Sequence, residues 1–350
     1  MAKSVLTADG ERIDYGALVL ATGSYAFVPP VPGRDLPSCH EYRTLDDLDA
    51  IRADALHALD TGHAPVGVVI GGGLPGLEAA NALRQFRLQT HVVEMAPRLM
   101  AQQLDEAGGG LLGRMITDLG IAVHVGVGTS SIERTERGSV LVTLSDGTAI
   151  ESGLVVFAAG VRPRDELARE AELDIAERGG VLTDLSCVTG DPNIYAIGEV
   201  AAIEGRCYGL VAPGYTSAEV VADRLLGGAA EFPEADMSTK LKLLGVDVAS
   251  FGDAMGTTPD CLEVVVNDAV NQTYAKLVLS DDVTTLLGGI LVGAASAYGV
   301  LRPMVGERLP GDPLALISPA GSEVAQANAV SGRCWPPRRS ARATTSPRAI

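Results

Sequence analysis

One stretch decides the fold: Val66-Gly67-Val68-Val69-Ile70-Gly71-Gly72-Gly73-Leu74-Pro75-Gly76-Leu77-Glu78. It opens with an apolar run of strand length, continues through glycines spaced G-x-G-x-x-G and ends in helical periodicity. In such a turn Gly71 permits the tight bend, Gly73 lets backbone N–H groups approach a pyrophosphate, and Gly76 lets the helix pack closely on the strand. Unpaired N–H groups at a helix N-terminus attract phosphate oxygens. The stretch therefore predicts a strand–turn–helix unit that binds a dinucleotide.

The next predicted strand, over 91–94, ends in an acidic residue, Glu94. A carboxylate at this position accepts hydrogen bonds from the ribose hydroxyls of the adenosine half of NAD. It also repels a 2′-phosphate, which favours NADH over NADPH. Because the cationic Arg98 is nearby in the sequence, the predicted cofactor is written more widely as NAD(P)H. A glycine turn without a ligand is the simpler alternative, but the flanking strand, the helix and the acid together favour a nucleotide site.

Strand and helix patterns alternate on both sides of this unit, with glycine at the strand ends. This alternation is typical of doubly wound parallel sheets. We expect strands over 17–21, 122–125 and 154–158, helices over 45–59, 77–86 and 104–119, and hairpins turning within 7–12 and at Asp146-Gly147. Beyond residue 232, the runs 261–266 and 274–279 predict an antiparallel sheet in a separate small domain.

Three strand ends suit a second, flavin nucleotide. One strand precedes Thr22 and Gly23, another precedes Gly160, and the third ends in Gly198 and Glu199. A carboxylate in the position of Glu199 can bind the ribityl hydroxyls of a flavin. Each strand end alone is a weak signal, but their order around the G-x-G-x-x-G unit predicts an FAD site.

The order of the motifs A-T-G, G-G-G-x-x-G, A-A-G-V-R-P and I-Y-A-I-G-E resembles the FAD/NAD(P)-dependent pyridine nucleotide oxidoreductases. The stretches 208–215 and 237–253 narrow the resemblance to the large subunits of assimilatory NAD(P)H-dependent nitrite reductases, over about residues 5–320. The resemblance implies an α/β fold with two dinucleotide-binding domains, doubly wound parallel sheets and a small α+β domain at the C-terminal end.

The resemblance also implies a function, that of an electron-input module that passes hydride from NAD(P)H to FAD. Gly71, Gly73, Gly76 and Glu94 would hold NAD, with Glu78 near the nicotinamide. The residues implied for FAD are Thr22, Gly23, Gly160, Gly198 and Glu199. No catalytic residue is assigned. In the whole family, electrons continue through iron–sulfur centres to sirohaem, where nitrite becomes ammonia.

The cysteines and histidines predict no metal site in this chain. The five cysteines are scattered without a C-x-x-C pair, so a zinc site, an iron–sulfur cluster and a disulfide scaffold are not expected. The same spacing argues against reductases that carry electrons beyond flavin on two thiols. The histidines, which also lack ligand spacing, are His40, His57, His63, His91 and His124. Iron–sulfur and sirohaem centres are expected only in the full-length family.

The resemblance divides the chain into four parts. Residues 1–45 and 151–230 would form an FAD-binding domain, 46–150 the NAD-binding domain, 231–318 the small C-terminal domain and 319–350 an irregular tail. The family's first G-x-G-x-x-G unit, which grips the FAD pyrophosphate, has no counterpart in the 20 residues before Ala21. The FAD-binding domain is therefore expected to be incomplete.

The tail is expected to be out of frame. A back-translation of residues 334–350, read one frame over, contains the string C-S-C-N-N-V-T-K-G, which resembles the cysteine segment that follows this module in the family. The codons are our choice, but the amino acids of the tail fix most bases of each codon in the other frame. Chance agreement over this length is therefore rare. Relative to the family, we expect a chain truncated at both ends.

The net charge of −17 argues against a nucleic-acid partner, since a phosphate backbone would be repelled. Residues 283–301 are uncharged, but their four glycines favour a buried strand and turn over a membrane helix. The start of the chain has no apolar signal-peptide core, and a cytoplasmic protein is predicted. The expected partners are NADH, FAD and a sirohaem-containing or small nitrite reductase subunit, and a homodimer is compatible with the sequence.

Two other functions stay open. A stand-alone FAD-dependent NADH reductase of rubredoxin or ferredoxin shares the motifs, although the stretch 237–253 disfavours it. An inactive, NAD-binding fragment is the other alternative, because the FAD pyrophosphate unit is not found. A yellow protein with bound FAD would exclude that fragment.

Overall fold

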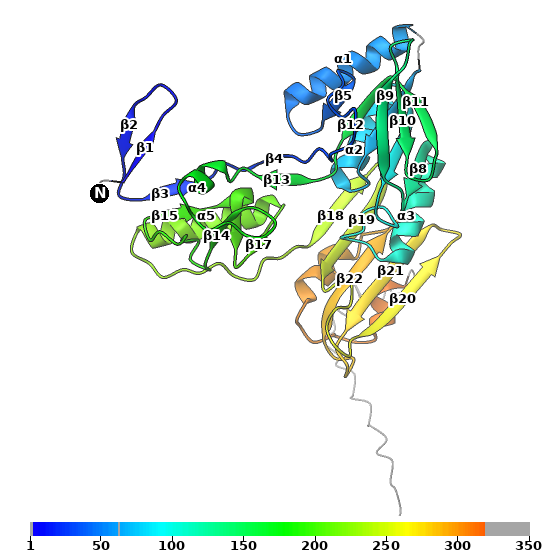
Figure 1. Ribbon diagram of the computed structural model, residues 1–350. Coiled ribbons are helices and arrows are strands. Elements are labelled where there is room, and N and C mark those ends of the chain that lie inside the picture. The colour runs from blue at the N-terminus through cyan, green and yellow to red at the C-terminus, as the bar shows by residue number, and fades with distance from the viewer. Residues whose placement is uncertain (1–2, 62–63, 319–350) are drawn as a thin grey trace, which may run out of the picture.

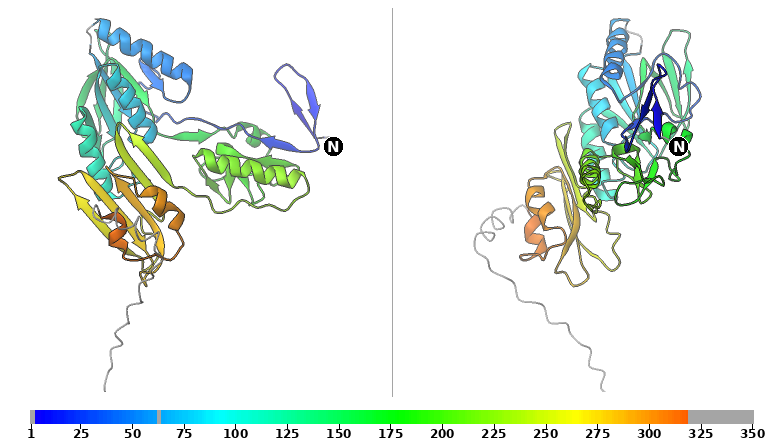
Figure 2. Two further views of the ribbon diagram at one scale, coloured as in Figure 1. Left: turned by 180° about the vertical axis from the view of Figure 1, so that it is seen from behind. Right: turned by 90° about the vertical axis from the view of Figure 1, so that its left-hand side faces the viewer.

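The computed structural model describes residues 3–61 and 64–318 of the chain. Figure 1 shows a central parallel sheet with its helices, a smaller β/α region beside it and a C-terminal sheet below. In the left view of Figure 2 the smaller region again projects sideways from the other two parts. Two antiparallel strands, β4 (Ser24–Ala26) and β13 (Val161–Pro163), connect the smaller region to the central sheet.

The central sheet holds five parallel strands in the order β5-β12-β6-β7-β8. They are β5 (Cys39–Glu41), β12 (Leu154–Phe157), β6 (Val66–Ile70), β7 (Gln89–Glu94) and β8 (Ile121–Val125). One face is covered by α1 (Leu45–Thr61), α2 (Leu74–Gln85) and α3 (Glu106–Asp118). The antiparallel strands β9 (Thr129–Arg134), β10 (Val140–Leu144) and β11 (Ala149–Ser152) cover the other.

Burial on both faces explains why the two central strands β6 and β12 are continuous apolar runs and not alternating ones. In β6, Val69 packs against the helices, whereas Val68 packs against the β9–β11 sheet. In β12, Val156 and Val155 divide in the same way. These two strands therefore each contribute to two hydrophobic cores.

The elements predicted for this part are confirmed in type and place. The helices expected over 45–59, 77–86 and 104–119 are α1, α2 and α3, and the hairpin at Asp146-Gly147 joins β10 to β11. The sheet, however, extends beyond the range 46–150 at both ends. The fully buried β12 pairs with β5 on one side and β6 on the other, so both strands belong to the central sheet.

The smaller region is built from short strands and helices. In it β3 (Leu18–Leu20) lies parallel to β15 (Ile194–Ala196), and a second sheet contains β14 (Val181–Thr183), β16 (Ala201–Ile203) and β17 (Arg206–Cys207). Its helices are α4 (Glu166–Glu170), α5 (Val211–Leu225) and the 3-10 turn η1 (Gly198–Val200). The hairpin expected within 7–12 is confirmed by β1 (Ser4–Leu6) and β2 (Arg12–Asp14), which stand out from the region (Figure 1).

The C-terminal sheet is antiparallel, as predicted, with the order β18-β19-β22-β21-β20. Its strands are β18 (Thr239–Leu243), β19 (Val246–Gly252), β22 (Leu286–Val292), β21 (Thr273–Leu279) and β20 (Leu262–Asp268). One face packs on α3, and the other packs with α6 (Tyr298–Leu301), η2 (Arg302–Met304) and α7 (Pro313–Ile317).

The uncharged run 283–301 contains β22 and α6, which confirms the predicted strand and turn. Within 3–61 and 64–318, no helix has the length and apolar character needed to cross a membrane. The tail that was expected to be out of frame lies outside the described residues.

The α2 interface makes a quantitative prediction about stability. Leu83 of α2 is fully buried, and its Cδ1 would lie 2.7 Å from a Cβ added to Gly67 of β6. Leu83→Ala should lower the free energy of unfolding by about 2–5 kcal/mol, because it leaves a cavity in a packed core. Leu45→Ala is the matched control, since Leu45 is 80% exposed, and should change it by less than about 0.5 kcal/mol. Urea denaturation measures both, and equal losses would contradict the packing described.

Candidate functional site

The glycine loop between β6 and α2 is fixed by close backbone contacts. Gly71 has φ +123°, and a Cβ on it would lie 2.3 Å from the carbonyl oxygen of Ala158. A Cβ on Gly76 would lie 1.9 Å from the carbonyl oxygen of Gly71. Because no larger side chain fits at either point, both glycines are required for the loop, the helix and the end of β12 to meet. The alanine that follows β12 belongs to the same contact.

Gly73 differs from these two glycines, because a Cβ on it would meet no atom of the described residues within 4 Å. It is the N-cap of α2 in extended conformation, and within the described chain no side chain caps this helix. The first N–H groups of an uncapped helix lack acceptors within the helix and carry partial positive charge. The open space and these donors together fit a pyrophosphate.

Glu94 lies at the edge of this loop, as expected for the end of β7. Its Oε2 accepts a hydrogen bond from the Gly72 N–H at 2.6 Å, and its Oε1 accepts one from the Ala96 N–H at 2.7 Å. Arg98 points its guanidinium elsewhere, since its Nε donates to the carbonyl of Leu104 at 2.7 Å. The negative charge of Glu94 therefore has no arginine partner in Arg98, which favours a nucleotide with free ribose hydroxyls.

A second polar group joins the smaller region to the central sheet. The Glu199 carboxylate accepts a hydrogen bond from Ser24 Oγ at 2.7 Å and from Arg43 Nη2 at 2.5 Å. Arg43 Nη2 also donates to Ser24 Oγ at 2.8 Å. Gly23 and Gly198 flank this group with φ near +70°. Because the side chains come from both parts, the cluster fixes a carboxylate at the junction between them.

The remaining predicted residues are more scattered. Thr22 is half-buried and donates its hydroxyl to the carbonyl of Arg164 at 2.6 Å. Gly160 has φ +111° between β12 and β13. Glu78 is exposed on α2, and its charge adds to burial in raising the pKa of Tyr42. The structure thus gathers Gly71, Gly73, Gly76 and Glu94 at one loop, and Gly23, Gly198 and Glu199 at the junction.

The sequence alone misses Ser24 and Arg43. Arg43 precedes a recognisable helix start, in which Thr44 N–H donates to Asp47 Oδ2 at 2.7 Å and Asp47 N–H donates to Thr44 Oγ1 at 3.2 Å. That signal predicts where α1 begins. It does not show that the arginine before it meets Glu199, which is 156 residues away.

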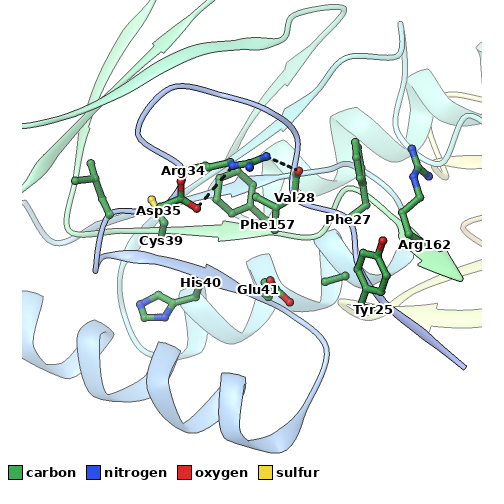
Figure 3. Close-up of a pocket in the computed structure, with 12 residues that line it drawn as sticks. Tyr25, Phe27, Val28, Arg34, Asp35, Cys39, His40, Glu41, Phe157 and Arg162 are labelled. Atoms are coloured by element: carbon green, nitrogen blue, oxygen red, sulfur yellow. Dashed lines mark hydrogen bonds and ion pairs between the residues drawn. The ribbon is translucent and has the colours of Figure 1, made fainter. Parts of the chain in front are cut away.

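A cavity of about 690 Å³ lies beside the connecting strands (Figure 3). Tyr25 and Arg162 line one end of it, and Arg34, Asp35 and His40 line the other. Its Cys39 is a poor nucleophile at neutral pH, because burial raises the pKa of the thiol to about 11. None of the predicted site residues lines this cavity, so it is separate from the glycine loop.

Metal ligation has no support in the described ranges. No group of three or more His, Cys, Asp or Glu side chains there is arranged to hold an ion, and the four cysteines are free thiols. His91 Nδ1 and His124 Nε2 lie 3.0 Å apart and hydrogen-bond to each other. His63 lies outside the described residues.

Residues 2–221 match the pyridine nucleotide-disulphide oxidoreductase family, and residues 238–307 match the rubredoxin NAD+ reductase C-terminal domain. The first match covers more than half of the chain. The chain belongs to the pyridine nucleotide-disulphide oxidoreductase family. The predicted fold class and the nucleotide-type loop agree with this membership.

Relatives of this family member differ in length. A nitrite reductase [NAD(P)H] large subunit of Klebsiella oxytoca is 52% identical over 91% of the chain, but the chain spans only 33% of that relative. A rubredoxin-NAD(+) reductase of Alcanivorax borkumensis is 33% identical over 84% of the chain and 73% of its own length. A solved ferredoxin reductase of Rhodopseudomonas palustris, 28% identical, superposes with a TM-score of 0.78 over 93% of this chain and 79% of its own.

The contact at Gly76 generates a test of the loop. Gly76→Ala should destabilise the protein by about 1–3 kcal/mol or more, because its methyl group would overlap the Gly71 carbonyl. Gly113→Ala in α3 meets open space among the described atoms and should be neutral or stabilising by up to about 1 kcal/mol. Thermal unfolding distinguishes the two, and a Gly76→Ala protein as stable as the wild type would refute this packing.

Proposed function

We propose that this chain is the electron-input module of an assimilatory nitrite reductase, which binds NADH at the glycine loop and reduces FAD. The proposal rests on the open, uncapped start of α2 at Gly73 beside the carboxylate of Glu94. The chain is more similar to a nitrite reductase large subunit than to a rubredoxin reductase, with 52% against 33% identity. This difference supports a role in nitrite reduction over one in rubredoxin reduction. Because the chain spans a third of that large subunit, reduction of nitrite itself is assigned to the rest of the longer protein.

The residues of the loop have separate roles in the proposed NADH complex. The first N–H groups of α2 hold the pyrophosphate, and Gly73 leaves room for it. Each oxygen of Glu94 has a further lone pair beyond its backbone hydrogen bond and can accept a ribose hydroxyl. Glu78, exposed further along α2, is assigned to the nicotinamide end. Gly71 and Gly76 act through the backbone geometry of the loop.

The proposed FAD site lies at the junction between the smaller region and the central sheet. The residues assigned to it are Thr22, Gly23, Gly160, Gly198 and Glu199. A Cβ on Gly23 or Gly198 would meet no described atom within 4 Å, which leaves space beside the Glu199 carboxylate. Bound FAD would supply the acceptor for the hydride of NADH. Arg43 and Ser24 hold Glu199 in place and limit its motion.

The partners of the module remain predictions. Iron–sulfur and sirohaem centres are assigned to the full-length enzyme, because residues 3–61 and 64–318 contain no metal-ligand cluster. A small or sirohaem-containing subunit would receive the electrons. A homodimer and a cytoplasmic location stay predictions from the sequence.

A second candidate, a stand-alone NADH:rubredoxin or ferredoxin reductase, is favoured by one observation. Residues 238–307 match the C-terminal domain of rubredoxin NAD+ reductases. Reduction of a rubredoxin by the purified chain and NADH, without any sirohaem protein, would support this alternative. An inactive NAD-binding fragment would instead bind NADH and remain colourless after incubation with FAD.

Gly73→Ala tests the nucleotide site. The variant should fold as the wild type does, because its methyl group enters open space. It should nevertheless weaken NADH binding by about tenfold or more, since the methyl group keeps the pyrophosphate from the backbone N–H groups. NADH fluorescence titration measures the dissociation constant, and thermal unfolding serves as the control. Unchanged affinity would place the nucleotide elsewhere.

Glu94→Gln tests the preference for NADH. Removing the negative charge should raise the ratio of NADPH to NADH affinity by about tenfold, equivalent to about 1.4 kcal/mol. The ratio is the informative quantity, because glutamine keeps only one acceptor for the two backbone N–H groups and can weaken both nucleotides. Titrations with each nucleotide give the ratio, and an unchanged ratio would mean that Glu94 does not face the ribose.

A further inference from the structure

A polar cluster with a buried lysine at its centre joins the C-terminal sheet to the central part. Lys276 of β21 is only 2% exposed, and its Nζ lies 2.9 Å from Glu263 Oε1 and 3.1 Å from Asp105 Oδ2. The Tyr274 hydroxyl, from the same strand, donates to Asp105 Oδ2 at 2.6 Å. A buried ammonium group is stable only when it is paired and hydrogen-bonded. The Lys276 ammonium group therefore depends on the carboxylates of Glu263 and Asp105.

Asp105 belongs to the central part and has a second task there. It is the N-cap of α3, and its Oδ1 accepts a hydrogen bond from the Gly108 N–H at 2.9 Å. Burial raises its pKa, but the hydrogen bonds from Tyr274, Gly108 and Lys276 outweigh this effect and hold the pKa below its ordinary value. Asp105 is therefore an anion at neutral pH and keeps its contacts with Gly108, Tyr274 and Lys276.

The segment 98–105 carries this cluster to the glycine loop. The Leu104 N–H donates to the Met100 carbonyl at 2.9 Å, and the Met100 N–H donates to the Gly72 carbonyl at 2.9 Å. Leu99 closes the contact, since its Cδ2 would lie 2.7 Å from a Cβ on Gly72. Leu99, Met100 and Leu104 are each at most 2% exposed. Few packing alternatives are open to a segment so fully buried.

The same strand also contacts the other parts of α3. The Tyr274 ring would lie 3.3 Å from a Cβ on Gly108, so the first turn of α3 rests against it. At the far end of the helix, Gln272 Nε2 donates to Asp118 Oδ2 at 3.0 Å. Tyr274 of β21 and Gln272, the residue just before this strand, therefore contact α3 near both of its ends. The helix α3 follows directly after the segment that supports Gly72.

We infer that Lys276 and Tyr274 are positioning residues for the nucleotide site, holding Gly72 and its neighbours in the binding geometry through Asp105 and the segment 98–105. This inference rests on the proposed function of the glycine loop. The C-terminal sheet then has a role in NADH binding although it contributes no residue to the glycine loop. Both side chains contact the Asp105 carboxylate, and the segment 98–105 links this residue to Gly72.

The test compares NADH binding in variants of the full 350-residue chain. Lys276→Met should raise the NADH dissociation constant by about tenfold, within the range that residues without ligand contact exert on a distant site. Lys276→Arg should restore most of the affinity, because it replaces the cation. Arg302→Met is the control: it removes a different ion pair of the C-terminal part, with Asp236, and should leave the dissociation constant unchanged.

Two readouts separate positioning from loss of folding. Hydrogen exchange at the Gly72 and Met100 amides, without nucleotide, should quicken in Lys276→Met and not in Arg302→Met. If Lys276→Met does not fold, Tyr274→Phe decides the question, because it removes only the hydroxyl and should still weaken NADH binding. Equal affinity and equal exchange in the variant that folds would overturn the inference. A wild-type protein that binds no NADH would instead overturn the proposed function.

Discussion

The structure depends on one steric constraint, the contact of three backbone segments with no space for side chains between them. The turn after β6, the first turn of α2 and the end of β12 meet at Gly71, Gly76 and Ala158. A Cβ at either glycine would fall well inside van der Waals distance of a carbonyl oxygen. The parallel pairing of β12 with β6 brings the carboxyl ends of both strands to this contact.

Charge and hydrogen bonding then give the loop its chemical character. An uncapped helix start offers donors, and Glu94 places a carboxylate beside them through its bonds to Gly72 and Ala96. The Nε of Arg98 donates to the Leu104 carbonyl, so this arginine is not directed at the Glu94 carboxylate. The C-terminal sheet contacts the end of the same segment, because Lys276 and Tyr274 bind the Asp105 carboxylate. The loop is thus supported by a part of the chain that is distant in sequence, as the contact of Lys276 with Asp105 illustrates.

Much of the central part could be predicted from the sequence, because buried parallel strands and amphipathic helices leave periodic apolar patterns. The glycine loop, Glu94 and the helices α1, α2 and α3 were all expected where they occur. The membership of β5 and β12 in one sheet was not, since a strand of three or four residues does not reveal its neighbours. The clusters of Arg43 with Glu199 and of Lys276 with Asp105 were also missed. They join residues distant in sequence, and no local pattern marks such a pair.

We propose that the glycine loop and the junction cluster form one electron-transfer unit. The test is an anaerobic titration with NADH. The purified chain is first incubated with FAD and then freed of excess flavin. We expect a protein-bound flavin whose visible absorbance is bleached as NADH is added. About one NADH should suffice for each flavin, because one hydride carries the two electrons that reduce one flavin. A chain that binds NADH but retains no flavin, or retains a flavin that NADH does not bleach, would contradict it.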